Sequence, residues 1–291
     1  MSAADRLRER LARGGILAAP GAPDSLTARL VQRAGFEAVY MTGFGATASR
    51  LGCPDIGLLT QTEMTTHARD MVRAVDIPVI ADADTGYGGP ANIARTMEEY
   101  AQAGVAAVHL EDQVAPKRCG QLAGIRLIPA AENVRRLRCA LAARPAGGPL
   151  VIGRTDAMPA LGAEEAVRRA LLYRDAGVDL VFVDGIKTIA EVEAVARHVP
   201  GPKVVSIVDG NETVALTARE LEQMGFAVVF YAVTALFAAT QAAAGALAAL
   251  QRDGTPARVG ATMGYAEFSA LVDLPRFQAL DEDYGSEPAT P

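Results

Sequence analysis

Short apolar segments alternate with longer amphipathic segments along most of the chain. The apolar segments have the length of buried strands and are Gly15–Pro20, Ala38–Thr42, Pro78–Asp84, Ala106–Asp112, Leu150–Asp156, Leu180–Asp184, Lys203–Val208 and Val228–Tyr231. The amphipathic segments have helical periodicity and are Ser25–Ala34, Gln61–Val75, Ala91–Ala103, Ala130–Ala143, Glu164–Ala176, Ile189–His198 and Thr217–Met224. Several of these helices are followed by a glycine, as at Gly35, Gly104, Gly177 and Gly225, where a left-handed cap would end the helix.

This order of elements predicts the fold class. Eight strand-then-helix units with continuously apolar strands indicate an α/β protein with a (β/α)8 barrel. An open, doubly wound sheet is the alternative. The count of eight units and the lack of a G-x-G-x-x-G motif after the first strand argue against it.

No linker or charge block divides the chain before about Asp253, so we expect a single barrel domain over residues 1–291. The segment Met1–Arg13 is charged and favours a helix, and it lacks the apolar core of a signal peptide. Over about residues 253–291 we expect a C-terminal extension. It would contain a helical stretch over Arg258–Leu274 and a tail over Leu280–Pro291 that frays.

Composition and charge exclude several classes of protein. Half of the residues are apolar and 21% are charged, so the chain can bury a large core and is not intrinsically disordered. The 28 Lys and Arg residues against 34 Asp and Glu residues give a net charge of −6, which argues against a nucleic acid as partner. The apolar stretch Thr234–Leu250 contains Gln241 and Gly245 and predicts a buried helix rather than a membrane span. With Cys53, Cys119 and Cys139 too scattered for a disulfide framework, we expect a cytoplasmic protein that binds neither nucleic acid nor membrane.

Polar residues stand at the C-terminal ends of six of the eight predicted strands, where a barrel of this kind places its active site. Among them, Asp82, Asp84 and Glu111 lie on adjacent strand ends and would repel one another unless a cation lies among them. Oxygen ligands without a nearby His or free Cys favour Mg²⁺, or Mn²⁺ in its place. The alternative is that these acids cap helices or pair with Arg154 and Lys117.

A loop after the fourth strand, Pro116–Gly124, carries two cations beside Cys119 and is flanked by glycines. Neighbouring positive charge lowers a cysteine pKa, and such a loop could close over a ligand, so Cys119 is a candidate acid or base. An ordinary surface loop is the alternative. Arg154 could bind a substrate carboxylate with its planar fork, or form an internal ion pair with Asp156 or Asp184.

Two further signals are weaker. The glycines of the segment 42–46 indicate a nest of backbone N–H groups for an anion, although glycines are also common in turns. The histidines show no metal-ligand spacing, and we interpret all three as structural; they are His67, His109 and His198.

Several segments, in this order, resemble the isocitrate lyase/phosphoenolpyruvate mutase superfamily: GAPDSLTARLVQRAGFEAVYMTGFG, LGCPDIGLLT, IPVIADADTGYG, VHLEDQVAPKRCG and IGRTDA. The resemblance extends from about Gly15 to about Ala239. It looks closest to the branch of methylisocitrate lyase, dimethylmalate lyase, oxaloacetate hydrolase and carboxyphosphonoenolpyruvate mutase. It implies a (β/α)8 barrel whose last helix is swapped between subunits, a homotetrameric dimer of dimers, Mg²⁺, and 2-oxo or 2-hydroxy acids handled through a pyruvate-like enolate.

The resemblance also implies roles for individual residues. In metal binding, Asp84 would hold the ion, and Asp82 and Glu111 would hold its waters. The residues implied in substrate binding are Tyr40, Thr42, Gly43, Gly120, Gln121, Arg154, Asp184 and Ser206. The residues implied in catalysis are Cys119, Asp55, Arg154 and Lys117.

The chain also departs from the family pattern. Gln121 stands where the lyases usually have the His of KRCGH, Asp184 replaces a Glu, and Ser206 replaces an Asn. Asp209 and Ile125 replace a further Glu and a Lys. These departures suggest a substrate different from methylisocitrate.

From the three carboxylates and Cys119 we expect a Mg²⁺-dependent carbon–carbon lyase. It would cleave a branched 2-hydroxy diacid, methylisocitrate- or dimethylmalate-like, through a pyruvate-type enolate. The alternatives are an oxaloacetate-type decarboxylase or hydrolase, a carboxyphosphonoenolpyruvate-type phosphonomutase, and a non-catalytic member that binds a 2-oxo acid.

Overall fold

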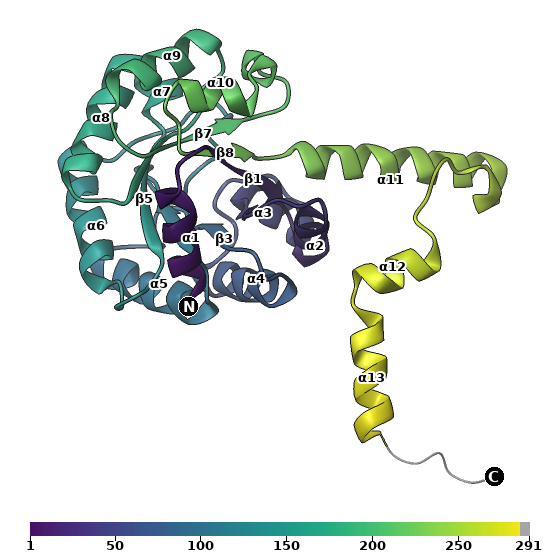
Figure 1. Cartoon of the computed structure of the whole chain (residues 1–291). Coiled ribbons are helices and arrows are strands. Elements are labelled where there is room, and N and C mark those ends of the chain that lie inside the picture. The colour runs from purple at the N-terminus through teal and green to yellow at the C-terminus, as the bar shows by residue number, and fades with distance from the viewer. Residues whose placement is uncertain (286–291) are drawn as a thin grey trace, which may run out of the picture. The chain divides into compact units, whose positions relative to one another are not determined.

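The computed structural model describes residues 1–285, and its eight parallel strands close into a barrel in chain order (Figure 1). The strands are β1 Leu17–Ala22, β2 Val39–Met41, β3 Val79–Asp82, β4 Ala107–Leu110, β5 Leu150–Thr155, β6 Leu180–Val183, β7 Lys203–Ile207 and β8 Val228–Tyr231. Leu17 of β1 lies in register with Val228 of β8, which closes the barrel. The predicted (β/α)8 fold is confirmed.

Helices follow the strands as predicted. Those of the barrel are α1 Ala3–Ala12, α2 Ser25–Arg33, α3 Gly43–Leu51, α4 Gln61–Ala74, α5 Pro90–Ala103, α6 Ala130–Ala143, α7 Ala157–Leu161, α8 Ala163–Asp175, α9 Ile189–His198, the 3-10 turn η1 Glu212–Ala215 and α10 Ala218–Gln223. The four glycines expected to end helices all have φ between 82° and 96°, which is the left-handed conformation of such a cap. The helix predicted at the N-terminus is α1, and its Ser2 and Asp5 form a capping box.

Two short helices were not predicted, α3 after β2 and α7 after β5. The glycines of the expected anion nest lie in the first turn of α3, which has Thr42 as its N-cap. Their N–H groups are not free, because Gly43 N donates to the Asp82 carboxylate and Gly45 N to Thr42. The Thr42 hydroxyl accepts a hydrogen bond from the Gly45 N–H at 3.4 Å. Gly43 and Gly45 stand in the first turn of this helix, and glycine has a low helix propensity, so these residues predicted a turn rather than a helix.

Inside the barrel, side chains from alternate strand positions form the core. They include Ala19, Tyr40, Ile80, Ile152, Phe182, Val204 and Phe230. Tyr40 and Phe230 stack with 4.1 Å between ring centroids, and Phe182 meets Phe230 edge-on at 5.6 Å. Because successive strand side chains point to opposite faces, the intervening residues pack outward against the helices. This aromatic layer forms the floor beneath the strand ends.

The chain divides into two compact units, Met1–Leu236 and Phe237–Pro291. The division lies within α11 (Thr234–Asp253), earlier than the boundary expected near Asp253. The second unit continues with the 3-10 turn η2 Pro256–Arg258, α12 Tyr265–Leu271 and α13 Leu274–Tyr284. The prediction of one helical stretch over Arg258–Leu274 is therefore wrong, because Gly260 and Gly264 interrupt it.

The frayed tail expected over Leu280–Pro291 is wrong for the residues up to Tyr284. Its first residues, Leu280 to Tyr284, belong to α13 rather than to a frayed tail, and residues 286–291 lie outside the described part of the chain. The expectation of a buried helix over Thr234–Leu250 is also wrong. Within the described residues, α11 buries only Ala249. By length and composition α11 is apolar enough to cross a membrane, and 6% of its apolar window is buried.

Candidate active site

Six polar rim residues stand two positions beyond interior residues of their strands, and so they share the inward face. Thr42 follows Tyr40, Asp82 follows Ile80, Glu111 follows His109, Arg154 follows Ile152, Asp184 follows Phe182, and Ser206 follows Val204. All of them except Asp184 are buried. The predicted residues from six strands therefore meet above the aromatic floor at the carboxyl end of the barrel.

Asp82 is held by backbone N–H groups on both of its oxygens. Oδ2 accepts a hydrogen bond from Gly43 N at 3.2 Å, and Oδ1 accepts one from Asp84 N at 2.9 Å. A Cβ on Gly43 would lie 2.4 Å from Asp82 Oδ2, so any larger residue at this position would displace the Asp82 carboxylate. Burial opposes ionisation of Asp82, but nearby His109, Lys117 and Arg154 outweigh burial and lower its pKa to about 2.

Lys117 lies between two carboxylates. Its Nζ is 2.8 Å from Asp55 Oδ1 and 2.8 Å from Asp84 Oδ1, and all three side chains are buried. Burial raises the pKa of Asp84 to about 6, although the Lys117 ammonium acts in the opposite direction. The ammonium therefore neutralises Asp84, one of the three carboxylates expected to need a cation, and it brings the predicted residues Asp55, Lys117 and Asp84 together.

Arg154 lies among three acids of the rim. It pairs with Asp156 through Nε at 3.0 Å and Nη2 at 2.7 Å, with Asp184 Oδ2 at 2.5 Å, and with Glu111 Oε2 at 3.3 Å. The internal ion pair considered as an alternative for this residue is thus present. Burial raises the pKa of Asp156 to about 6. Burial also raises the pKa of Glu111 well above its usual value.

A buried network behind Arg154 was not predicted. The Asp112 carboxylate accepts hydrogen bonds from the Thr155 hydroxyl at 2.7 Å, Asp156 N at 3.0 Å, Arg169 Nη1 at 2.9 Å and the Tyr173 hydroxyl at 2.6 Å. Asp112 directly follows Glu111, so strand alternation places it on the outer face of the barrel, against α8. It holds in place the segment that carries Asp156, the partner of Arg154.

His109, interpreted from the sequence as structural, lies between two predicted site residues. Its Nε2 is 3.0 Å from the Tyr40 hydroxyl, and its Nδ1 is 3.6 Å from Asp82 Oδ1. Burial lowers the pKa of His109 to about 4, so the imidazole is neutral at pH 7. Its position two residues before Glu111 is the signal that could have placed it on the inward face.

The loop that carries Cys119 packs onto the site. Cys119 N donates a hydrogen bond to the Asp55 carbonyl at 3.0 Å. A Cβ on Gly120 would lie 2.5 Å from Asp184 Oδ2, so the loop backbone touches the rim. Gln121 Oε1 accepts a hydrogen bond from Asn211 Nδ2 at 3.1 Å, while Gln121 Nε2 is buried without a partner.

The expectation that neighbouring positive charge lowers the pKa of Cys119 is wrong. Burial raises the pKa of the thiol to about 12, because the cost of desolvating a thiolate exceeds the attraction of Lys117. Cys119 therefore holds its proton near neutral pH. A thiol in this state can donate a proton to a strongly basic carbon, whereas it is poorly suited to act as a base.

The arrangement of the carboxylates shows whether they could hold a divalent cation. Within residues 1–285, no group of three or more His, Cys, Asp or Glu side chains is placed to hold a metal ion. The three predicted carboxylates therefore do not form a compact set of direct ligands. However, both oxygens of Glu111 are buried without a hydrogen-bond partner, and such acceptors require donors, which the waters of a hydrated cation would supply. An all-oxygen set with waters suits Mg²⁺.

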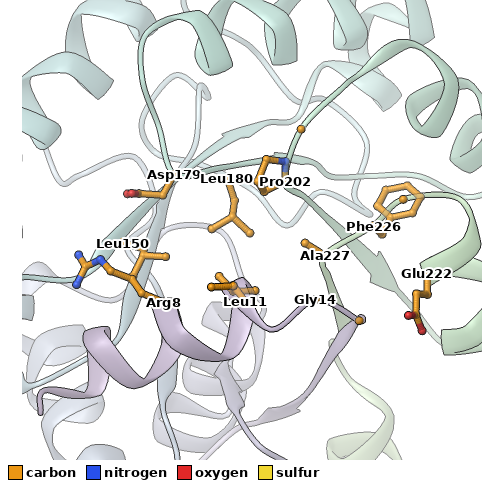
Figure 2. Close-up of a pocket in the computed structure, with 14 residues that line it drawn as sticks. Arg8, Leu11, Gly14, Leu150, Asp179, Leu180, Pro202, Glu222, Phe226 and Ala227 are labelled. Carbon is orange, nitrogen blue, oxygen red and sulfur yellow. The ribbon is translucent and has the colours of Figure 1, made fainter.

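Of two surface cavities, one is lined by residues of this site and the other is not. A cavity of about 610 Å³ is lined by Asp84 and Lys117, together with parts of the segments 57–62 and 85–88. Another, of about 560 Å³, lies at the amino end of the barrel, where Leu11 of α1 meets Leu150 and Leu180 (Figure 2). No predicted site residue lines this second cavity, and we assign it no role in catalysis.

Comparisons with known proteins agree with this geometry. A family model described as phosphoenolpyruvate phosphomutase matches residues 7–251. The chain is 39% identical over 287 residues to the 2,3-dimethylmalate lyase of Eubacterium barkeri, covering 98% of this chain and 99% of that protein. A solved oxaloacetate acetylhydrolase with the inhibitor 3,3-difluorooxalacetate superposes with a TM-score of 0.91, at 34% identity and 99% coverage of both chains.

A phosphonopyruvate hydrolase solved with oxalate and Mg²⁺ is also similar, with a TM-score of 0.89 and 31% identity. The match covers 98% of this chain and all of the hydrolase chain. The family model spans most of the sequence, and these enzymes share the fold of this chain. This chain belongs to the phosphoenolpyruvate mutase/isocitrate lyase superfamily.

Proposed function

We propose that this protein is a Mg²⁺-dependent carbon–carbon lyase that cleaves a branched 2-hydroxy diacid into a 2-oxo acid and a second acid. The observation that carries the proposal is the position of Cys119: its loop packs against the rim at Asp184, and its backbone N–H donates to the Asp55 carbonyl at 3.0 Å. Cleavage leaves a carbon that must gain a proton, and a thiol with a pKa of about 12 holds one for it. The relatives named dimethylmalate lyase and methylisocitrate lyase support this assignment.

The chemical step can be written with this chain's own residues. Asp55 accepts the proton of the substrate hydroxyl, and Lys117, 2.8 Å away, holds the Asp55 carboxylate in place. The bond between C2 and C3 breaks, C2 becomes the carbonyl carbon of the 2-oxo acid, and the electron pair remains on C3. The Cys119 thiol gives its proton to C3. The proton taken by Asp55 then restores the thiol, so no proton is gained or lost overall.

Binding of the substrate rests on the rim. We assign Arg154 to the carboxylate of the 2-oxo acid portion, since its guanidinium is fixed in position by Asp156 and Asp184. Tyr40, Thr42 and Gly43 would line the floor and wall beside it. Gly120, Gln121 and Ser206 would surround the departing portion, where the amide and hydroxyl groups are neutral. The altered residues Gln121, Asp184 and Ser206 therefore select the substituents of the substrate.

We assign the metal to Asp84, with Asp82 and Glu111 acting through water. Two findings support this assignment. Neither buried oxygen of Glu111 accepts a hydrogen bond, although Oε2 lies 3.3 Å from Arg154 Nε, and a similar phosphonopyruvate hydrolase was solved with Mg²⁺. When bound, Mg²⁺ supplies positive charge where negative charge develops on the substrate oxygen. Lys117 and Arg154 remain as the fixed cations of the site.

Hydrolysis of an oxaloacetate-like acid is the second candidate function. It is favoured by the similarity to oxaloacetate acetylhydrolase and by Gln121, which, unlike the histidine usual in the lyases, cannot carry a proton at neutral pH. In that reaction water attacks the carbonyl carbon before the carbon–carbon bond breaks. The two functions share the same rim and differ in their products.

We further propose that α11 packs against a second copy of the chain in a homotetramer built as a dimer of dimers. The helix is apolar and Ala-rich, and only Ala249 is buried within the described residues. An exposed apolar surface of this kind is typical of a subunit interface. Light scattering from the full-length protein should give the mass of a tetramer, and a monomer at micromolar concentration would contradict this proposal.

The test of function is a product assay with purified protein and Mg²⁺. The panel should contain dimethylmalate, methylisocitrate, oxaloacetate and carboxyphosphonoenolpyruvate. We expect a 2-oxo acid and a second acid from a branched 2-hydroxy diacid, and loss of this activity with a chelator. Oxalate and acetate from oxaloacetate would indicate the hydrolase, CO₂ with pyruvate a decarboxylase, and a new carbon–phosphorus signal a phosphonomutase. Binding of 2-oxo acids without turnover would indicate a non-catalytic member.

A further inference from the structure

The loop after β3 has an unusual backbone. Asp84 and Tyr87 have φ of 46° and 59°, although neither is a glycine, and Gly86 and Gly88 have φ of 80° and 145°. Side chains with a Cβ adopt such angles at a cost, and they do so at sites where the surroundings hold them. The loop therefore requires external contacts to keep the Asp84 carboxylate where Lys117 meets it.

Arg136 of α6 provides two of these contacts from one nitrogen. Its Nη2 donates hydrogen bonds to the Thr85 carbonyl at 2.6 Å and to the Gly88 carbonyl at 2.7 Å. The two carbonyls lie on either side of the strained residue Tyr87, and the first belongs to the residue that follows Asp84. Hydrogen bonds from a charged donor are stronger than neutral ones, so this guanidinium can hold a strained backbone.

Other contacts hold the start of the loop. Gly86 N donates to the Ala83 carbonyl at 2.9 Å, and Glu111 N donates to the Asp84 carbonyl at 3.0 Å. The hydrogen bond to Asp84 fixes it relative to β4. In the segment 85–88, the Gly86 carbonyl accepts a hydrogen bond from the Thr96 hydroxyl at 3.3 Å, and the Tyr87 hydroxyl lies 3.3 Å from that of Tyr100. These contacts are neutral, whereas the contacts from Arg136 come from a charged donor. Arg136 links that segment to α6, a helix that contributes no side chain to the rim.

We propose that Arg136 is a positioning residue for Asp84: its guanidinium clamps the strained segment 85–88 and thereby presents the Asp84 carboxylate to the divalent cation. The proposal rests on the proposed function, in which Asp84 holds the metal. Without the clamp, the segment relaxes toward unstrained angles and the carboxylate moves out of place. Residues that orient a metal ligand typically change metal affinity or activity by about 10–100-fold when they are replaced.

The test uses Arg136→Met and Arg136→Lys, with Arg135→Met as the matched control. Arg135 is the neighbouring residue of the same helix, is exposed and lines the same cavity, but it donates neither of the two hydrogen bonds to the loop, so its replacement removes the same charge and leaves the clamp in place. Hydrogen exchange of the segment 84–88, without metal or substrate, measures the clamp. Calorimetric titration with Mn²⁺ measures the affinity of the site, and kcat and KM follow with the best substrate of the panel.

We expect faster exchange in the segment 84–88 for Arg136→Met, Mn²⁺ affinity and kcat lower by about 10–100-fold, and wild-type values for Arg135→Met. Arg136→Lys keeps a cation, but an ammonium cannot reproduce the two hydrogen bonds of the guanidinium. Its exchange rate, Mn²⁺ affinity and kcat should therefore lie between those of the wild type and Arg136→Met. Millimolar guanidinium, which can enter the cavity of about 500 Å³ beside Arg136, should restore part of the affinity of Arg136→Met.

Unchanged exchange and Mn²⁺ affinity in a folded Arg136→Met would overturn the proposal while leaving the proposed function intact. If Arg136→Met does not fold, the same comparison is made with Arg136→Lys, and wild-type values there would also overturn it. A wild-type protein that binds no Mn²⁺ and turns over no substrate would instead refute the proposed function. Equal losses in Arg135→Met and Arg136→Met would assign the effect to the charge of α6 and would also overturn the proposal.

Discussion

The Lys117 ammonium lies 2.8 Å from a carboxylate oxygen of Asp84 and at the same distance from one of Asp55. This buried bridge joins the loop that carries Cys119 to the end of β3. Charges that are buried together are tolerated only as a paired set, so each member depends on the others. The bridge therefore couples the stability of the barrel mouth to its chemistry.

Replacing Lys117 by Met should cost both stability and activity. Two buried carboxylates would lose their shared cation, and breaking a buried pair in this way costs about 3–5 kcal/mol. We expect that decrease in the free energy of unfolding, measured by urea titration, together with loss of turnover. Arg118→Met, an exposed neighbour on the same loop, is the control and should change stability little.

The double variant Lys117→Met/Asp55→Asn tests the cause. It removes one of the two stranded carboxylates, so part of the lost stability should return while activity does not. If Lys117→Met unfolds at the same urea concentration as the wild type, the bridge contributes nothing to stability and this account is wrong.

Replacing Cys119 by Ser should lower kcat by about 100–10,000-fold and leave KM nearly unchanged, because the thiol acts only when the carbon receives its proton. The pKa of about 12 also predicts slow alkylation of Cys119 by iodoacetamide between pH 6 and 9. The exposed Cys53 serves as an internal reference and should react first. Peptide mass spectrometry measures both rates. Rapid alkylation of Cys119 near pH 7 would show that it is a thiolate, contrary to the proposed role as an acid.

Stabilisation by Mg²⁺ should be smaller at pH 5 than at pH 7.5. Burial raises the pKa of Asp84 to about 6, so at pH 5 most of this carboxyl is protonated in the folded protein and protons compete with the metal. Without metal, Asp84 affects the free energy of unfolding in the opposite direction. Because its folded pKa is raised, it stabilises the fold at low pH, and this stabilisation is lost as pH rises through 6. The metal affinity should fall about tenfold, or about 1.4 kcal/mol, between the two pH values.

Thermal unfolding with and without Mg²⁺ at each pH measures this difference. Taking the difference cancels the titration of groups remote from the metal. Equal shifts of Tm at pH 5 and pH 7.5 would mean that Asp84 does not hold the ion.

Replacing Gly43 by Ala should displace Asp82. The added methyl group would lie 2.4 Å from Asp82 Oδ2, where the Gly43 N–H now donates at 3.2 Å. We expect Mn²⁺ affinity to fall by about 10–100-fold, as for other residues that orient a metal ligand, while Tm changes little. Gly89→Ala is the control, because a Cβ there meets no atom within 4 Å. Wild-type affinity in Gly43→Ala would exclude this contact as a determinant of the site.

Much of the fold could be predicted from the chain, because its signals are local. Strand and helix periods and helix-ending glycines act over a few neighbouring residues, and these signals placed all eight strands and most barrel helices. The C-terminal ends of the predicted strands also indicated which polar residues lie at the rim, from Thr42 to Ser206. Where the local pattern was weak, as in the glycine-rich start of α3, the prediction failed.

The amino-acid sequence by itself therefore determined the barrel and the set of polar residues at its mouth. Only the tertiary structure decided how those residues are paired and which hold protons. Lys117 meets Asp55 across 62 positions of the chain, and burial raises the pKa of Cys119 despite the cations beside it. Coulomb interactions and desolvation depend on distances and burial in space, and neighbours along the chain do not reveal either.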